Sequence, residues 1–123
     1  MKPVNFYRAL AVLYAGAVFV LSLMPESGSP GYGWDKANHF IAYAVMSFLF
    51  MRTAVTSNRP FVMTAVGVFL AVLLFGIAVE FFQSLTPTRH ADFRDALANG
   101  LGSIAGIVAF KLLRNRAGVK RCS

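Results

Sequence analysis

The sequence has few charged residues, few acids and almost no cysteine. Of its 123 residues only 14% are charged, five are Asp or Glu, and Cys122 is the one cysteine. A single cysteine excludes an intramolecular disulfide and a metal site built from several cysteines. The chain is 57% hydrophobic with a mean hydropathy of +0.60, whereas soluble domains have about 45–50% apolar and about 25% charged residues. One domain of this length could not bury so much apolar surface, so the composition predicts a membrane protein.

Four apolar stretches are long enough, or nearly so, to cross a bilayer as helices. We expect them at about 6–24, 37–51, 61–82 and 95–113, followed by a basic tail at 114–123. The second is the shortest and the most polar, and Pro60 is expected at the first helical position of the third. A cleaved signal peptide is the alternative for the first stretch, but no small-residue cleavage site follows Met24. The sequence therefore predicts one all-α domain, a bundle of four transmembrane helices.

Basic residues gather in the segments that four crossings would place on one side of the membrane. With both termini assigned to the cytoplasm, the inner segments contain nine of the twelve Lys and Arg and no acid: Lys2, Arg8, Arg52, Arg59, Lys111, Arg114, Arg116, Lys120 and Arg121. The outer loops and helix ends contain Lys36, Arg89 and Arg94 with all five acids, Glu26, Asp35, Glu80, Asp92 and Asp95. This asymmetry follows the positive-inside rule for a multi-pass protein of the bacterial cytoplasmic membrane. It explains the net charge of +7 without a nucleic-acid partner, and membrane lipids are expected partners.

Three short polar patches lie at the outer ends of the second, third and fourth predicted helices. Their spacings are i, i+4, i+8 in the first, i, i+3 in the second and i, i+3, i+7 in the third, for Asp35, His39 and Tyr43, then Glu80 and Gln83, then Asp92, Asp95 and Asn99. Each spacing puts its members on one face of a helix. In a bundle these faces would converge on one outward-facing polar cavity, with His39, Glu80, Arg89 and Asp95 within reach of a common volume.

Several of these residues also have purely structural interpretations. Asp35 and Asp92 are suited to capping helix N-termini. Lys36 and Arg89 are suited to reaching the membrane interface with their charged ends. A lone histidine such as His39 is more often structural than catalytic. Both interpretations stay open for each of these residues.

Glu80 differs because it lies inside the most apolar stretch. A charged side chain at the centre of a membrane helix costs about 2.5–3.5 kcal/mol on insertion scales, and such residues usually face a cavity or a partner. We expect Glu80 to be either protonated or paired with a cation, and we favour pairing with Arg89, just past the end of the same helix.

The fourth predicted helix has a stripe of small residues. It consists of Ala98, Gly102, Ala105, Gly106 and Ala109 and contains a Gly-x-x-x-Gly step. Small residues let helix backbones approach closely in membranes. We expect this helix to dock against the second and third through the stripe.

Together these patches resemble the VanZ-like family of small bacterial membrane proteins. The residues that carry the resemblance are Asp35, Lys36, His39, Phe40, Tyr43, Glu80, Gln83, Pro87, Arg89, Asp92, Asp95, Asn99 and Gly102. The match covers about Asp35 to Gly106, and the first helix fits by position only. The resemblance implies four transmembrane helices in a bacterial cytoplasmic membrane and, for the founding member, a contribution to resistance against the glycopeptide teicoplanin.

Two classes of function remain open from the residues. One is an envelope protein whose outer cavity binds a lipid-linked or cell-wall headgroup, or a glycopeptide-related ligand. Cationic contacts would come from Lys36, Arg89 and Arg94, and further contacts from Asp35, Tyr43, Gln83, Asp92 and Asn99. A transporter is a weaker third reading, because four helices leave little room for alternating access.

The other class is a small membrane hydrolase or transferase. In it His39 would be a general base or metal ligand, and Glu80, Asp92 or Asp95 an acid, an orienting group or an oxygen ligand. The sequence has no serine or cysteine nucleophile motif and no glycine-rich phosphate loop before a helix. A histidine with carboxylates is compatible with a divalent metal but identifies neither a metal nor another cofactor.

Overall fold

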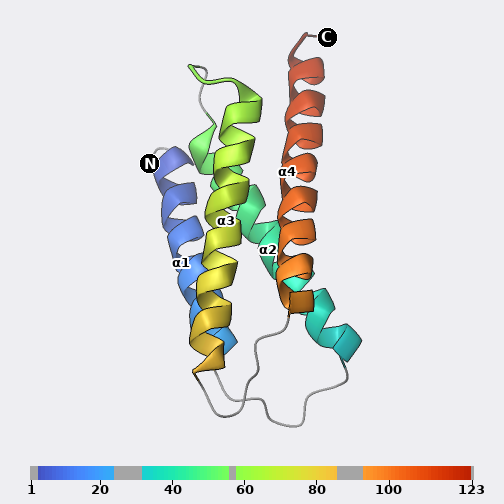
Figure 1. Cartoon of the computed structure of the whole chain (residues 1–123). Helices are drawn as coiled ribbons and strands as arrows, with labels where there is room; N and C mark the ends of the chain where they lie inside the picture. The colour runs from blue at the N-terminus through green and yellow to red at the C-terminus, as the bar shows by residue number, and fades with distance from the viewer. Residues whose placement is uncertain (1–2, 24–31, 56–57, 86–92, 123) are drawn as a thin grey trace.

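The described residues form a bundle of four helices. The computed structural model describes residues 3–23, 32–55, 58–85 and 93–122, with side chains described within 5–23, 37–55, 58–85 and 93–116. The helices are α1 (Pro3–Leu23), α2 (Tyr32–Ala54), α3 (Phe61–Ser84) and α4 (Phe93–Cys122), and the described residues contain no strand. Successive helices run in opposite directions, so the beginnings of α1 and α3 and the ends of α2 and α4 lie at one end (Figure 1). The predicted all-α four-helix architecture is confirmed.

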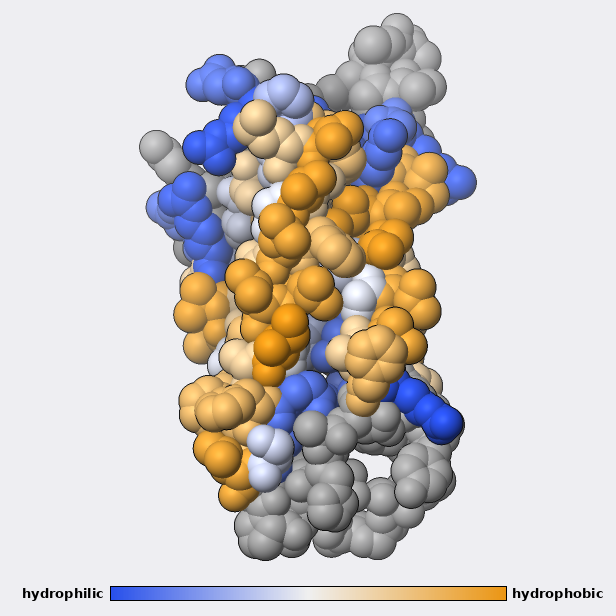
Figure 2. Space-filling view, in the orientation of Figure 1, coloured by the Kyte–Doolittle hydropathy of each residue, from blue (hydrophilic) through white to orange (hydrophobic). Residues whose placement is uncertain are grey.

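Among the described residues, three helices are long and apolar enough to cross a membrane. These segments are Asn5–Leu23, Phe61–Ser84 and Phe93–Arg116, and apolar residues cover much of the middle of the face shown in Figure 2. α2 is not among them, because its 23 residues include Asn38, His39 and Arg52. α2 contacts all three other helices, and α4 most extensively. Protein therefore covers much of its surface.

Two helices are longer than the apolar stretches predicted. α2 begins at Tyr32, before the expected start at residue 37, and α4 continues to Cys122, so the segment 114–122 is helical instead of a separate tail. Hydropathy marks the part of a helix that lipid can cover. The backbone hydrogen bonds of a helix can continue beyond that part, because polar residues such as Lys and Arg are good helix formers. Because Asp35 lies inside α2, it is not the N-cap of that helix. Pro60 is the N-cap residue of α3, one position before the predicted one.

α4 packs against α2 through the small-residue stripe. A Cβ added at Gly102 would fall on the carbonyl group of Phe40, and one added at Gly106 would fall on the carbonyl oxygen of Ala44 and the hydroxyl of Ser47. The hydroxyl of Ser47 also donates a 2.8 Å hydrogen bond to the carbonyl oxygen of Ser103. The expected docking is thus found against α2, with the two backbones in direct contact.

α1 completes the bundle along α2 and α3. The Tyr14 hydroxyl donates a 2.8 Å hydrogen bond to the carbonyl oxygen of Ala42 in α2. The ring of Phe19 packs edge-on against Phe75 and Phe82 of α3, with centroids 6.4 and 5.6 Å apart. The apolar core is a cluster formed by Tyr43, Met46, Met51, Val68, Val72 and Phe110.

Cationic side chains surround aromatic rings at the end of the bundle where α1 and α3 begin, which we call the basic end. The Arg52 guanidinium lies 4.7 Å from the ring centre of Tyr7, and Lys111 and Arg114 lie 5.6 and 5.7 Å from that of Phe61. Hydrophilic surface gathers at this end in the space-filling view (Figure 2). Aromatic rings and long basic side chains are typical anchors at a membrane–water interface.

Candidate functional site

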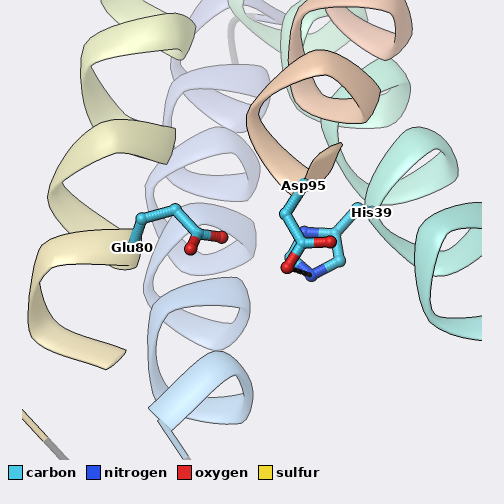
Figure 3. Close-up of side chains that lie close together, drawn as sticks. All are labelled: His39, Glu80 and Asp95. Carbon is cyan, nitrogen blue, oxygen red and sulfur yellow. Dashed lines mark ion pairs between the residues drawn. The ribbon is translucent and has the colours of Figure 1, made fainter. Parts of the chain in front are cut away.

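Three helices bring ionisable side chains together at the end opposite the basic end. His39 comes from the second turn of α2, Glu80 from the last turns of α3 and Asp95 from the first turn of α4. All three are buried, and one possible ligand atom of each lies within 4.8 Å of those of the others. The carboxyl groups of Glu80 and Asp95 and the ring of His39 point toward one another (Figure 3). We call these three residues the ionisable cluster.

Asn99 fixes the orientation of the histidine ring. The Nδ1–H of His39 donates a 3.1 Å hydrogen bond to Oδ1 of Asn99, one turn after Asp95 on α4 and only 2% exposed. An amide oxygen only accepts hydrogen bonds, so this contact places a proton on Nδ1. Nε2, the other ring nitrogen, then faces Oδ2 of Asp95 at 3.8 Å. This distance is too long for a hydrogen bond.

A glycine of α3 makes room for this arrangement. A Cβ at Gly76 would come within 2.9 Å of Nδ2 of Asn99 and 3.4 Å of Cε1 of Tyr43. Gly76 lies one turn before Glu80 on the same buried face of α3. Any larger residue there would push Asn99 or Tyr43 away from the histidine.

Tyr43 and Gln83 extend the site toward α1. The ring of Tyr43 is stacked on that of His39, with centroids 6.3 Å apart and 10° between the planes. Its hydroxyl is fully buried and has no hydrogen-bond partner among the described residues. The side-chain amide of Gln83 donates a 2.6 Å hydrogen bond to the carbonyl oxygen of Ser22 in α1.

A pocket of about 460 Å³ opens beside the ionisable cluster, between α1, α2 and α3. One part of its wall is polar, and the other is formed by aliphatic side chains of α1 and α2. The lining residues are Tyr14, Ala17, Val18, Leu21, Ser22, Asn38, His39, Ile41, Ala42, Tyr43 and Gln83. The pocket thus joins an apolar wall to the histidine.

The structure places only some of the predicted site residues. It brings His39, Tyr43, Glu80, Gln83, Asp95 and Asn99 to one end of the bundle. Asp35 and Lys36 belong to α2, but their side chains are outside the described part, and Arg89 and Asp92 lie outside the described residues altogether. The predicted pairing of Glu80 with Arg89 therefore stays a prediction. Arg94 is exposed at the start of α4.

Several residues of the site were not predicted, although the sequence contains a signal for three of them. Gly76 is four residues before Glu80, Ser47 four after Tyr43, and Ser103 four after Asn99. Each of these three residues lies one helical turn beyond a predicted site residue, so extending the polar faces by one turn identifies them. The α1 wall of the pocket gives no such signal, because the carbonyl of Ser22 is a backbone group.

The fold and the site together define a small α-helical membrane protein with a buried polar site at one end of its bundle. The chain belongs to the VanZ/LLP1 family, whose family model matches residues 5–114. The resemblance noted in the polar patches is thereby confirmed. Neither a curated protein nor a solved structure matches the chain significantly.

Proposed function

We propose that this protein binds a lipid-linked or cell-wall headgroup in a polar cavity that faces the outside of the bacterial cytoplasmic membrane. The observation that supports the proposal best is the pocket beside the ionisable cluster, which has a polar wall and an apolar wall. Ligand sites are concave, mostly apolar and oriented by a few polar groups, and this pocket fits that description.

The two walls suit the two parts of a lipid-linked ligand. Asn38, His39 and Gln83 offer hydrogen-bonding groups to a headgroup, while Val18 and Leu21 of α1 face the same space as apolar partners for an alkyl chain. Lys36, Arg89 and Arg94 would add charge-assisted contacts to a phosphate or carboxylate.

The proposed orientation places both termini in the cytoplasm, with α2 as a fourth crossing and the site facing outside. The arrangement of the helix ends supports this orientation, because both termini leave the bundle near the basic end (Figure 1). The test is labelling of single cysteines from outside in a variant without Cys122. Cysteines near residues 31 and 89 should react and one at residue 57 should not; efficient labelling at residue 57 contradicts the orientation.

Filling the pocket tests ligand binding directly. The probe is a long-chain polyprenyl phosphate added to the detergent-purified protein, with the polyprenol that lacks the phosphate as the ligand control. Ala17→Phe narrows the pocket, whereas Gly16→Phe adds the same ring one residue earlier, where no atom of the described residues lies within 4 Å of a Cβ. We expect at least tenfold weaker binding of the phosphate for Ala17→Phe alone. Equal binding by both variants, or equal binding of phosphate and alcohol, contradicts the proposal.

A link to teicoplanin resistance is the finer part of the proposal. It is tested by expressing the chain in a teicoplanin-susceptible bacterium and measuring the minimum inhibitory concentration. The proposal expects an increase that Ala17→Phe removes and Gly16→Phe retains. An unchanged inhibitory concentration for the unmodified chain removes the resistance part and leaves headgroup binding to its own test.

A second candidate function is a membrane-embedded hydrolase or transferase. The observation that favours it is the proximity of His39 to two buried carboxyl groups, those of Glu80 and Asp95. His39 would act as a general base and a carboxyl group as acid or orienting group, with Asp92 as a further candidate. Release of inorganic phosphate or of the headgroup from the lipid probe, lost in His39→Ala, is the expected result. Intact probe after prolonged incubation contradicts this function while leaving binding possible.

A further inference from the structure

We infer that the ionisable cluster is a binding site for one divalent transition-metal ion, most suitably zinc, held by Nε2 of His39 and carboxylate oxygens of Glu80 and Asp95. The three ligands come from three different helices, so the ion would tie α2, α3 and α4 together at this end of the bundle (Figure 3).

The distances between the atoms suit a shared ion better than direct bonds. Zinc lies about 2.0–2.2 Å from nitrogen and oxygen ligands, which puts two of its ligands about 3.4 Å apart at a tetrahedral angle. Nε2 of His39 and Oδ2 of Asp95 are 3.8 Å apart, and the atom of Glu80 lies within 4.8 Å of both. Small side-chain rotations bring all three to bonding distance.

Asn99 prepares the histidine for metal binding. Its side-chain oxygen accepts the proton on Nδ1 of His39, which leaves the lone pair of Nε2 directed toward Asp95. Metal-binding histidines almost always donate their second N–H in this way, and the partner sets the tautomer and the ring orientation. Asn99 is accordingly a positioning residue and not a ligand.

The charge of the cluster favours a divalent cation. As metal ligands, two carboxylates and a neutral imidazole would together carry a charge of −2, which matches the charge of one divalent ion in magnitude. The mixture of one imidazole and two carboxylates suits zinc, because imidazole is a poor ligand for Mg²⁺ and Ca²⁺, which take oxygen ligands.

The hydroxyl of Tyr43 points to a further ligand of the ion. Tyr43 is 1% exposed, its ring is stacked on His39, and its hydroxyl lacks a partner among the described residues while lying within electrostatic range of Glu80 and Asp95. Three protein ligands leave a coordination position open, and a water or phosphate oxygen there could accept a hydrogen bond from this hydroxyl. That the open position receives a headgroup rests on the proposed function; binding of the ion does not.

The experiment measures zinc in the purified full-length chain, in a Cys122→Ser background so that the terminal thiol does not contribute. The protein is stripped with EDTA, loaded with zinc, desalted and analysed by mass spectrometry for metal content. We expect about one zinc per chain. His39→Ala and Glu80→Gln should each lower the content at least tenfold, and Asn99→Ala should weaken zinc affinity about 10–100-fold. Thr53→Ala, which removes a hydroxyl at the other end of α2, should retain the full content.

Cobalt provides a readout that does not depend on comparing variants. Cobalt loaded into the Cys122→Ser protein should give the visible absorption of a four- or five-coordinate site, and zinc should displace it. Less than a tenth of an equivalent of zinc in helical wild-type protein overturns the inference, and so does equal zinc in wild type, His39→Ala and Glu80→Gln. Binding of polyprenyl phosphate to the EDTA-treated protein is measured separately, so that failure of the metal site and failure of headgroup binding are distinguished.

Discussion

The helices α2 and α3 differ sharply in composition and in what surrounds them. α3 is the most apolar span of the bundle, with a mean hydropathy of 2.7, and it turns one complete face outward: Val62, Met63, Val66, Leu70, Leu74, Ile77 and Phe81. α2 is too polar to be recognised as a span, yet its contacts with the other helices are the most extensive in the bundle. Hydropathy thus reports how much of a helix faces lipid and says little about how central the helix is.

A few buried polar or charged residues stand out on each of these two helices. His39 and Ser47 are buried in α2 because α4 covers them, and Glu80 is the one acid of α3, on the face that turns away from lipid. If α2 is held by close backbone contact and α3 mainly by side-chain packing, substitutions in the two helices and their partners should have different consequences.

The largest effect is expected where α4 meets α2. Gly106→Leu places a side chain where even a Cβ would overlap the Ala44 carbonyl and the Ser47 hydroxyl, and it should cost about 3 kcal/mol or more. Gly67→Leu on α3 is the control, since no atom of the described residues lies within 4 Å of a Cβ there. Unfolding in mixed detergent micelles measures both. Equal loss of stability in the two variants would break the contrast between the helices.

A loss of function without a loss of fold is expected at Glu80. Glu80→Gln should leave the protein in the membrane while abolishing its envelope function, because the amide keeps the shape but not the charge of the carboxylate. Glu80→Leu should also be inactive, although it is compatible with folding in an apolar helix. Teicoplanin susceptibility and membrane content are the measurements, with the exposed neighbour substituted as Phe81→Leu for control. Full activity of both Glu80 variants would show that the acid of α3 is dispensable.

A moderate difference in the free energy of unfolding is expected between substitutions on the buried face and on the exposed face of α3. Val72 is fully buried and Leu74, two residues later, is 65% exposed. Val72→Ala removes packing contacts and should cost about 1–2 kcal/mol, whereas Leu74→Ala should stay within about 0.5 kcal/mol. The free energy of unfolding in detergent decides between them. A larger cost at Leu74 would mean that the outward face of α3 is covered by another molecule.

The smallest effect is expected for the hydrogen bond between α2 and α4. Ser47→Ala removes the bond from the hydroxyl to the carbonyl of Ser103 and should cost about 0.6 kcal/mol, the average for such bonds in membrane proteins. Thr53→Ala is the matched control on α2, because that hydroxyl bonds only to the carbonyl of Phe50 in its own helix. A cost above about 2 kcal/mol would mean that α2 and α4 are held together mainly by polar contacts and not by the close packing of their backbones.

Much of this arrangement is readable from spacing. The positions of Asp95 and Asn99 on one face, and of Glu80 and Gln83 on another, follow from helical periodicity alone, and Gly102 and Gly106 indicate a close approach. The sequence does not predict that these glycines contact the backbone carbonyl groups of Phe40 and Ala44. Every residue has a carbonyl group, so only the packing of the two helices determines which of them lie against the glycines.

The limits of the helices were less predictable. Hydropathy does not predict the start of α2 at Tyr32 or the helical continuation of α4 to Cys122, because both segments are polar. The contact between α1 and the site is not predictable from the sequence for another reason. Gln83 bonds to a backbone oxygen of Ser22, and backbone groups leave no trace in a residue pattern.

The polarity of α2 has a consequence for how the protein is made. A helix that contains Asn38, His39 and Arg52 gains little by entering lipid alone, since each such side chain opposes insertion. Its entry into the bilayer then depends on neighbours that are already there or arrive with it. α1 is synthesised first and donates the Tyr14 hydroxyl to the backbone of Ala42, whereas α4, which covers the polar face, is synthesised last. If α2 is the proposed fourth crossing, we therefore expect it to be stable in the bilayer only after α4 has packed against it.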